Sequence, residues 1–208
     1  CIVGAGFMGR THAETLEAIP RARVSVVCSR DAARANALAA QVGAVAVADY
    51  DKAVAREDVD VVSVCSPSGT HAEIATTAAL AGKHLVVEKP LDVTLERVDK
   101  IIRVAQESAV KLTCVFPLRF MEGCILARQA IRGGRLGRLV LANAYIKWYR
   151  DQDYYDLSDW KGTWKLDGGG ALMNQGIHNV DLLNYLVGPV SRVVGRIDTL
   201  AHRMETED

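Results

Sequence analysis

The sequence predicts an α/β protein whose N-terminal domain is a doubly wound parallel sheet and whose second domain begins after residue 117. Short apolar runs alternate with helical patterns over the first 115 residues, which is typical of strands joined by crossover helices. A glycine-rich turn follows the first apolar run, and after Pro117 the rhythm changes to longer helices and loops. We therefore place the two domains at residues 1–117 and 118–208.

Six short strands and five helices are predicted in the first domain. The strands are expected at 2–4, 22–29, 44–47, 59–66, 84–89 and 111–116. The helices are expected at about 7–18, 31–41, 51–55, 70–81 and 94–108. In an open parallel sheet of this kind, a ligand binds outside the carboxyl ends of the strands.

The second domain is predicted to contain a helix at 121–132, a strand at 139–149, and a helix that starts near residue 168 and stops near Val187. A polar and aromatic loop at 147–164 precedes the last helix. The chain starts at the end of what should be a first strand, and 192–208 resembles strand sequence with no closing element. We expect the sequence to be a fragment of a longer protein.

The composition narrows the possible partners. The chain has 208 residues, half of them hydrophobic, with 25 basic and 25 acidic side chains. This balance gives no basic excess for nucleic-acid phosphates or an anionic membrane, and no apolar run approaches the roughly 18 residues of a membrane span. Five scattered cysteines without CxxC spacing indicate reduced thiols, so we expect a soluble cytoplasmic protein, although a signal peptide cannot be judged.

The turn GAGFMG has the spacing GxGxxG between a predicted strand and a predicted helix. Gly4 permits the tight turn, Gly6 lets the backbone approach a pyrophosphate, and Gly9 allows close packing of helix and strand. The N–H groups of the helix start, with Phe7 and Met8, would face the anion. The turn predicts a dinucleotide site, and the alternative is a structural glycine turn.

The second strand ends in CSRD, where many dinucleotide-binding proteins carry an acid that binds the ribose 2′-hydroxyl of NAD. Ser29 and Arg30 occupy that turn here, and Asp31 comes one or two places late. Arg30 could pair with a 2′-phosphate, which favours NADP over NAD. The alternative is an exposed Arg30 followed by Asp31 as a helix N-cap.

Two further strand ends carry candidate cofactor contacts. Ser66 and Pro67 end the fourth strand, and His71 opens the helix behind Thr70, a suitable N-cap; a surface or capping role for His71 is the alternative. The fifth strand ends with Glu88 and Lys89. A lysine there would emerge into the cleft and stabilise a developing negative oxygen, unless it simply pairs with Glu88 in solvent.

The stretch GGGALMNQGIHNVDLLNYLVG places Asn174, His178 and Asp181 at i, i+4 and i+7, on one face of a helix. Asparagine is a poor ligand for transition metals, and no second histidine or cysteine lies at a suitable spacing from His178. We therefore predict no metal site. A purely structural role would require three polar groups to be satisfied inside the core.

In the preceding loop, Trp160 and Lys161 are candidates for substrate contact, or they anchor the loop.

Taken together, GxGxxG, SPSGTHAEIATTAALAGKHLVVEKP, LRF at 118–120 and WKGTW followed by GGGALMNQGIH closely resemble the glucose-fructose oxidoreductase, inositol dehydrogenase and rhizopine-catabolism (Gfo/Idh/MocA) family. The resemblance covers essentially the whole chain. It implies a C-terminal α/β domain on an open, mostly antiparallel sheet that commonly forms the oligomer interface, and hence a homodimer or homotetramer. It also implies an NAD(P)-dependent oxidoreductase acting on a sugar, polyol or related hydroxyl or carbonyl.

The resemblance assigns roles to individual residues. Lys89 would hydrogen-bond the reacting oxygen, and His178 would be the general acid/base of the second domain, with Arg119 among the substrate contacts. The polyol dehydrogenases often have aspartate four residues before that histidine, where this chain has Asn174. An amide can orient the substrate and the imidazole but supplies no charge, which puts an Asp-His relay in doubt.

Two other functions are also compatible with these residues. Similar folds include NAD-dependent glycosidases, which oxidise the sugar transiently, eliminate and reduce back. A non-catalytic sugar or cofactor sensor is the third possibility, and its expected mark would be loss of the lysine or the histidine.

Overall fold

The computed structural model describes residues 1–208, which divide into two compact units, Cys1–Val115 and Phe116–Asp208. The boundary lies within two residues of the division predicted after residue 117. No helix combines the length and the apolar character that a membrane span requires.

The first unit is built on six parallel strands in the order β3-β2-β1-β4-β5-β6. The strands are β1 (Ile2–Val3), β2 (Val26–Cys28), β3 (Val45–Val47), β4 (Val61–Val64), β5 (His84–Val87) and β6 (Leu112–Cys114). This order, with a switch of direction between β1 and β4, is that of a dinucleotide-binding sheet. All six strands were predicted, and each is shorter than or equal to its predicted range.

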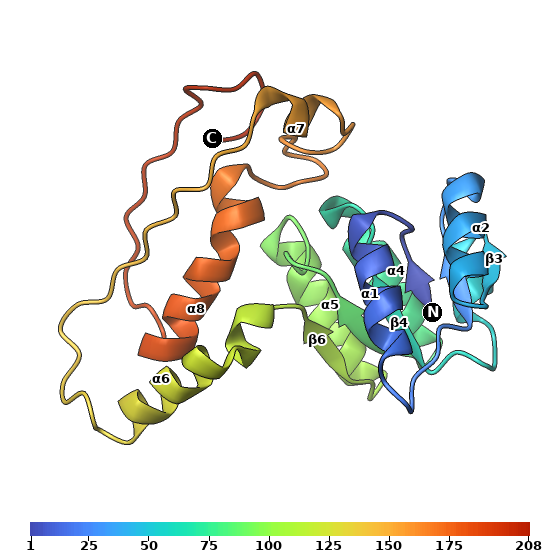
Figure 1. Cartoon of the computed structure of the whole chain (residues 1–208), viewed down its shortest axis with the longest axis horizontal. Coiled ribbons are helices and arrows are strands. Elements are labelled where there is room, and N and C mark those ends of the chain that lie inside the picture. The colour runs from blue at the N-terminus through green and yellow to red at the C-terminus, as the bar shows by residue number, and fades with distance from the viewer. The chain divides into compact units, whose positions relative to one another are not determined.

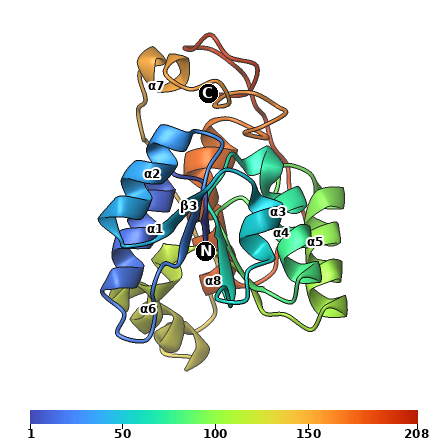
Figure 2. The same cartoon turned by 90° about the vertical axis from the view of Figure 1, so that its right-hand side faces the viewer.

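Helices cover both faces of this sheet. They are α1 (Phe7–Glu17), α2 (Ala32–Gln41), α3 (Tyr50–Val54), α4 (His71–Leu80) and α5 (Leu95–Glu107). Figure 2 shows α1 and α2 on one face and α3, α4 and α5 on the other. Two buried apolar clusters follow this division, one including Ile2, Ala13 and Leu38, the other including Val62, Ala75 and Ile101. The valine-rich strands β2 and β4, which are buried except at Val61, fit this layering.

The second unit contains the helices α6 (Glu122–Arg132), α7 (Gln152–Asp156) and α8 (Ile177–Val187), and a short 3₁₀ turn, η2 (Pro117–Phe120). Figure 1 shows α6 beside the lower end of α8, with two extended runs of chain beside them. The predicted helix at 121–132 and the predicted stop near Val187 are confirmed. The short helix α7 was expected to be loop; Asp151 caps its N-terminus by accepting a hydrogen bond from the Tyr154 N–H at 3.0 Å.

No strand forms in the second unit. The predicted strand at 139–149 is extended, but no neighbouring strand pairs with it, and Val140 and Leu141 are exposed. Residues 192–200 are likewise extended and exposed, with Val193 and Val194 in solvent. A β-strand is defined by its ladder of hydrogen bonds, and apolar alternation alone predicts only which residues are ready to pair. The expected open sheet of this domain is therefore not formed by residues 116–208.

The last helix does not begin as an α-helix. Residues Leu172–Gly176 form a π-helical turn that leads directly into α8. A π turn holds one more residue per hydrogen-bonded loop than an α turn and is frequently found at functional sites. The turn changes the angular register between residues before it and residues after it, which alters the face that the sequence spacing predicted for Asn174.

Candidate functional site

The glycine-rich turn has the close contacts that a dinucleotide site requires. Gly4 has a φ of +107°, and a Cβ there would lie 2.5 Å from the carbonyl oxygen of Cys65. A Cβ on Gly9 would lie 1.8 Å from the Gly4 carbonyl oxygen, so only glycine lets α1 approach β1 this closely. Around Gly6, in contrast, a Cβ would meet no protein atom within 4 Å. This geometry accounts for glycine at positions 4 and 9, and the pyrophosphate contact of Gly6 stays a prediction.

The start of α1 is suited to an anion. Gly6 is its N-cap, so no side chain accepts a hydrogen bond from the first N–H groups of the helix. Phe7, predicted to contact the cofactor, is 83% exposed at this end, and Met8 is partly exposed. Free helix N–H groups beside an open glycine are the arrangement that holds a pyrophosphate. The residues present therefore fit a bound dinucleotide.

The end of β2 shows what each of the two interpretations expected, a helix cap by Asp31 and an exposed Arg30. Asp31 caps α2 by accepting a hydrogen bond from the Arg34 N–H at 3.0 Å, as the alternative proposed. Ser29 accepts a hydrogen bond from the Asp31 N–H at 3.2 Å. The Arg30 side chain is exposed, and no hydrogen bond or ion pair within the protein engages it. Arg30 can therefore still meet a phosphate, whereas Asp31 is committed to the cap.

His71 is buried and links two strand ends. The residue is 1% exposed, with Nδ1 at 2.9 Å from the carbonyl oxygen of Pro90 and Nε2 at 2.9 Å from that of Ser66. Burial lowers the pKa of His71, and the two carbonyl oxygens oppose that shift. The surface or capping alternative is wrong for this residue, because its ring braces the turns after β4 and β5. A direct contact with a cofactor stays a prediction.

The N-terminus of α4 is capped from a distance. Thr70 stands at the N-cap position, as predicted, but its hydroxyl donates to the Pro67 carbonyl at 2.7 Å and does not cap the helix. Asp92 takes that role by accepting a hydrogen bond from the Ala72 N–H at 2.7 Å. Asp92 is buried and also pairs with Arg97 at 2.7 Å. Ser66 and Pro67, both predicted to contact the cofactor, lie in the turn that these bonds fix.

Glu88 and Lys89 follow β5 directly, at the same edge of the sheet as the glycine turn. Glu88 is 6% exposed and forms its ion pair with His12 of α1, with 2.9 Å between His12 Nε2 and a carboxylate oxygen. The alternative in which Glu88 pairs with Lys89 in solvent is therefore wrong. Lys89 leaves the strand end with its N–H donated to the other Glu88 oxygen at 3.1 Å.

In the second unit, Asn174 is bonded to an acid that the sequence analysis did not single out. Its amide nitrogen lies 2.9 and 3.2 Å from the two carboxylate oxygens of Asp167, which is 1% exposed. The Gly162 N–H also donates to Asp167, at 2.9 Å. A carboxylate is thus present beside Asn174, although the sequence has no acid at the i−4 position itself.

The other two polar residues of this stretch have different neighbours. Asp181 pairs with Arg119 through two hydrogen bonds, one of them 2.8 Å long. The Arg119 guanidinium also lies 5.3 Å from the ring centroid of Tyr185, so it holds η2 against α8. His178 makes an edge contact with Phe116, with 6.3 Å between ring centroids. Asp181 is thus engaged by Arg119, and a substrate contact for Arg119 stays a prediction.

The aromatic loop is held by a second set of contacts. The Lys161 Nζ lies 3.5 Å from the ring centroid of Tyr154 and donates to the Tyr154 carbonyl at 3.4 Å. Burial lowers the pKa of Lys161, while Asp167 opposes that shift. The hydroxyl of Tyr154 accepts a hydrogen bond from Gln175 at 3.2 Å. Trp160 is partly exposed, and its carbonyl accepts from Thr163 at 2.6 Å. These contacts anchor the loop and place a cationic side chain beside a buried acid.

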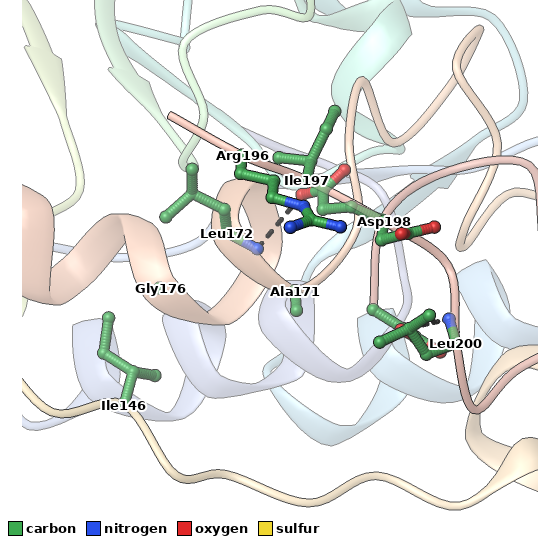
Figure 3. Close-up of a pocket in the computed structure, with 10 residues that line it drawn as sticks. Ile146, Ala171, Leu172, Gly176, Arg196, Ile197, Asp198 and Leu200 are labelled. Carbon is green, nitrogen blue, oxygen red and sulfur yellow. Dashed lines mark hydrogen bonds between the residues drawn. The ribbon is translucent and has the colours of Figure 1, made fainter. Parts of the chain in front are cut away.

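A cavity of about 490 Å³ lies elsewhere in the second unit (Figure 3). Its wall is largely apolar and includes Ile146, Leu172, Ile197 and Leu200. The backbone N–H of Leu172 donates to Glu207 across its rim at 3.1 Å. None of the residues predicted to bind substrate lines this cavity. It is therefore separate from the candidate site.

Sequence reasoning missed three participants in these networks. His12 lies on the helix face that carries the buried Gly9 and Ala13, so helical periodicity could have placed it against the sheet. Asp92 and Asp167 carry no such signal, because each acts through contacts far along the chain or across a turn. No group of three or more histidine, cysteine, aspartate or glutamate side chains is placed to hold a metal ion.

Two related proteins of known structure or function match most of this chain. The WlbA dehydrogenase from Bordetella pertussis, solved in complex with NADH and UDP-GlcNAcA, is 35% identical with a TM-score of 0.96, and the match covers 100% of this chain and 60% of that chain. Inositol 2-dehydrogenase from Rhizobium meliloti (strain 1021) is 32% identical over 192 residues, which are 91% of this chain and 56% of the relative.

Levoglucosan dehydrogenase from Pseudarthrobacter phenanthrenivorans is 29% identical over 208 residues, which are 95% of this chain and 53% of the relative. The chain thus spans a little over half the length of the curated relatives that it matches. Residues 1–116 match the family described as "Oxidoreductase family, NAD-binding Rossmann fold", and residues 125–208 match the "GFO/IDH/MocA C-terminal domain". With both domains matched in order, the chain belongs to the Gfo/Idh/MocA family of oxidoreductases.

Proposed function

We propose that the protein containing this chain transfers a hydride between NAD(P) and a hydroxyl-bearing carbon of a sugar, polyol or related substrate. One observation carries the proposal: the open glycine turn after β1 and Lys89 after β5 share the carboxyl edge of one parallel sheet. That edge is where an open α/β sheet binds its ligand. A lysine there can act on a substrate oxygen next to a bound dinucleotide.

The mechanism assigns a task to each residue. His178 removes the proton from the substrate hydroxyl as the carbon–hydrogen bond breaks and the carbon–oxygen double bond forms. Lys89 donates a hydrogen bond to that oxygen and stabilises the negative charge that develops on it. Asn174, held by Asp167, orients the substrate or the imidazole. A bound nicotinamide supplies the hydride acceptor, and the reverse reaction uses the same groups in the opposite sense.

The substrate class is proposed from the relatives. WlbA was solved with UDP-GlcNAcA, and the other two relatives are named for inositol and levoglucosan. All three names refer to sugars or cyclic polyols with several hydroxyl groups. We therefore propose a substrate of this kind, free or linked to a nucleotide, and expect Arg119, Trp160 and Lys161 to contribute to its binding.

The decisive experiment is a substrate screen with the purified full-length protein. UDP-GlcNAcA, myo-inositol and levoglucosan would be tested with NAD and with NADP, and the absorbance of the reduced nicotinamide would be followed. We expect turnover with one substrate class, loss of turnover in Lys89→Ala and His178→Ala, and retained cofactor binding in both variants. Full activity in either variant would refute the role proposed for that residue.

We further propose that Arg30 favours NADP(H) over NAD(H). The support is its exposed guanidinium at the end of β2, where Asp31 is occupied as the α2 cap. A charge-assisted bond to the 2′-phosphate would give the preference. Arg30→Ala should weaken NADP binding about tenfold or more and leave NAD binding nearly unchanged. Equal losses for both cofactors, or tighter binding of NAD by the unmodified protein, would refute the preference.

The oligomeric state is also a proposal. Apolar side chains such as Val140, Leu141 and Val194 are exposed on the extended segments of the second unit. We propose that this domain carries the contact surface of a homodimer or homotetramer. Light scattering of the full-length protein would test this, and a monomer at micromolar concentration would refute it.

A further inference from the structure

A buried network of polar side chains crosses the first unit from α1 to the end of β5. It starts at His12, whose Nδ1 lies 2.6 Å from the Ser63 hydroxyl of β4. The Ser63 hydroxyl in turn lies 3.6 Å from the Cys65 thiol. On the other side of the ring, Nε2 lies 2.9 Å from Glu88. The network therefore joins one helix to two neighbouring strands.

The ion pair of this network, between His12 and Glu88, is shielded from solvent. The side chains of His12 and Glu88 are 14% and 8% exposed. Interactions with Cys65 first and with Glu88 second raise the pKa of His12 to about 10, against the opposing effect of burial. The imidazole is therefore charged at neutral pH, which provides the buried carboxylate with the counter-charge that it needs.

The two carboxylate oxygens of Glu88 accept hydrogen bonds from different donors. One accepts from His12, and the other accepts from the Lys89 N–H at 3.1 Å. The Glu88 N–H donates to the Val64 carbonyl at 3.0 Å, so the residue is also tied into the sheet. Glu88 thus joins the backbone N–H of Lys89 to the imidazole of His12 on the helix.

We propose that His12 is a positioning residue for Lys89: by holding Glu88, it sets the direction in which Lys89 leaves β5 toward the sheet edge. This inference rests on the role of Lys89 in the proposed function. It makes α1 serve two purposes, since the first turn of the helix faces the dinucleotide and the second turn orients a catalytic lysine. A substitution on α1 should then change the chemical step.

The test compares three substitutions in the full-length protein. His12→Leu removes both hydrogen bonds and should lower kcat about ten- to a hundredfold, the effect of losing a hydrogen bond to a charged group. The affinity for the cofactor should stay within about threefold, because the glycine turn is intact. His12→Gln can still donate to Glu88 and accept from Ser63, so it should recover most of kcat. Glu88→Gln has one acceptor oxygen in place of two, so it can accept from only one of the two partners and should lower kcat as His12→Leu does.

His84→Leu is the matched control. It makes the same change at the first residue of β5, where the ring only accepts a hydrogen bond from the Lys111 N–H at 3.2 Å. We expect its kcat to be unchanged. If His12→Leu and His84→Leu lower kcat equally, or if His12→Leu lowers kcat only as far as it lowers the folded fraction, His12 is structural and the proposal is wrong.

A measurement on the unmodified protein covers the case in which His12→Leu does not fold. The nitrogen chemical shifts of the His12 ring should show both nitrogens protonated at about pH 8, between the ordinary histidine pKa of 6.5 and about 10. A ring whose Nε2 carries no proton at that pH would refute the hydrogen bond donated to Glu88 and with it the proposal.

Failure of this inference can be told apart from failure of the proposed function. If Lys89→Ala abolishes turnover but His12→Leu does not change it, only the positioning role is wrong. If Lys89→Ala keeps full turnover, the proposed function is wrong, whatever His12→Leu does.

Discussion

The amide nitrogen of Asn174 lies 2.9 and 3.2 Å from the two carboxylate oxygens of the buried Asp167. An aspartate at position 174 would bring a second carboxylate against the first. Two carboxylates sharing a buried site repel each other and cannot both stay charged at low cost. The amide at position 174 and the acid at position 167 are therefore complementary.

Asn174→Asp should destabilise the protein by about 1–3 kcal/mol from the lost donor alone, with repulsion added to that. The folded variant should take up a proton to relieve the repulsion, so its deficit relative to the original protein should grow as the pH rises from about 4 to about 7. Urea unfolding at several pH values would measure this. Asn174→Ala is the control, since it lacks the added charge, and a deficit equally independent of pH in both variants would contradict the argument.

The two glycines Gly6 and Gly9 should respond differently to alanine. Gly9→Ala would put a Cβ 1.8 Å from a backbone oxygen and should cost about 3 kcal/mol or more. Gly6→Ala meets no protein atom within 4 Å, so its melting temperature should barely change. Its affinity for NAD(P) should nevertheless fall, because the added methyl occupies the space proposed for the pyrophosphate. Thermal unfolding and cofactor titration measure both, and unchanged affinity in Gly6→Ala would exclude that placement.

The pair of the buried Asp92 and the partly exposed Arg97 should contribute far more to stability than a fully exposed pair. Asp92→Ala removes the α4 cap and leaves Arg97 without its 2.7 Å partner, so we expect a loss of about 3 kcal/mol. Arg34→Ala breaks the exposed pair with Asp31 and should cost at most about 1 kcal/mol. Denaturant unfolding of both variants compares them. Similar losses would show that burial does not determine the difference.

The stability contributed by His12 should depend on pH in a definite direction. Its pKa is raised from 6.5 to about 10 in the folded protein, so the contribution is fully present below about pH 6.5 and is lost as the pH rises through about 10. The difference in unfolding free energy between the original protein and His12→Gln should therefore shrink from about pH 6 to about pH 10. A difference that stays constant over this range would show that the ring does not carry the charge.

Much of the first unit could be predicted from the sequence, because local pattern and topology agree there. Valine-rich runs, helical spacing and the GxGxxG turn each point to the same sheet, and the ligand edge then follows from the order of the strands. The contacts that brace this edge could not be predicted in the same way. His71 and Asp92 bind groups about 20 residues away in sequence, and no local periodicity records such a pairing.

The second unit was predicted less well for a different reason. The strand expected at 139–149 has a suitable apolar pattern, but a strand needs a partner, and sequence alternation does not supply one. The polar face of Asn174, His178 and Asp181 was derived from an ideal α-helix. Its contacts with Asp167, Phe116 and Arg119 come from outside the helix, where helical spacing records nothing.

The π turn at Leu172–Gly176 also affects how related sequences should be compared. A helix usually accommodates one inserted residue by forming such a turn. A relative that lacks one residue here would keep the same residues on each face of α8, but the residues before the turn would face a different direction. Alignments through this region should therefore count positions separately on the two sides of the turn. Engineering follows the same rule: deleting one residue within 172–176 would rotate the segment carrying Asp167 by about 100° relative to His178, while leaving α8 itself unchanged.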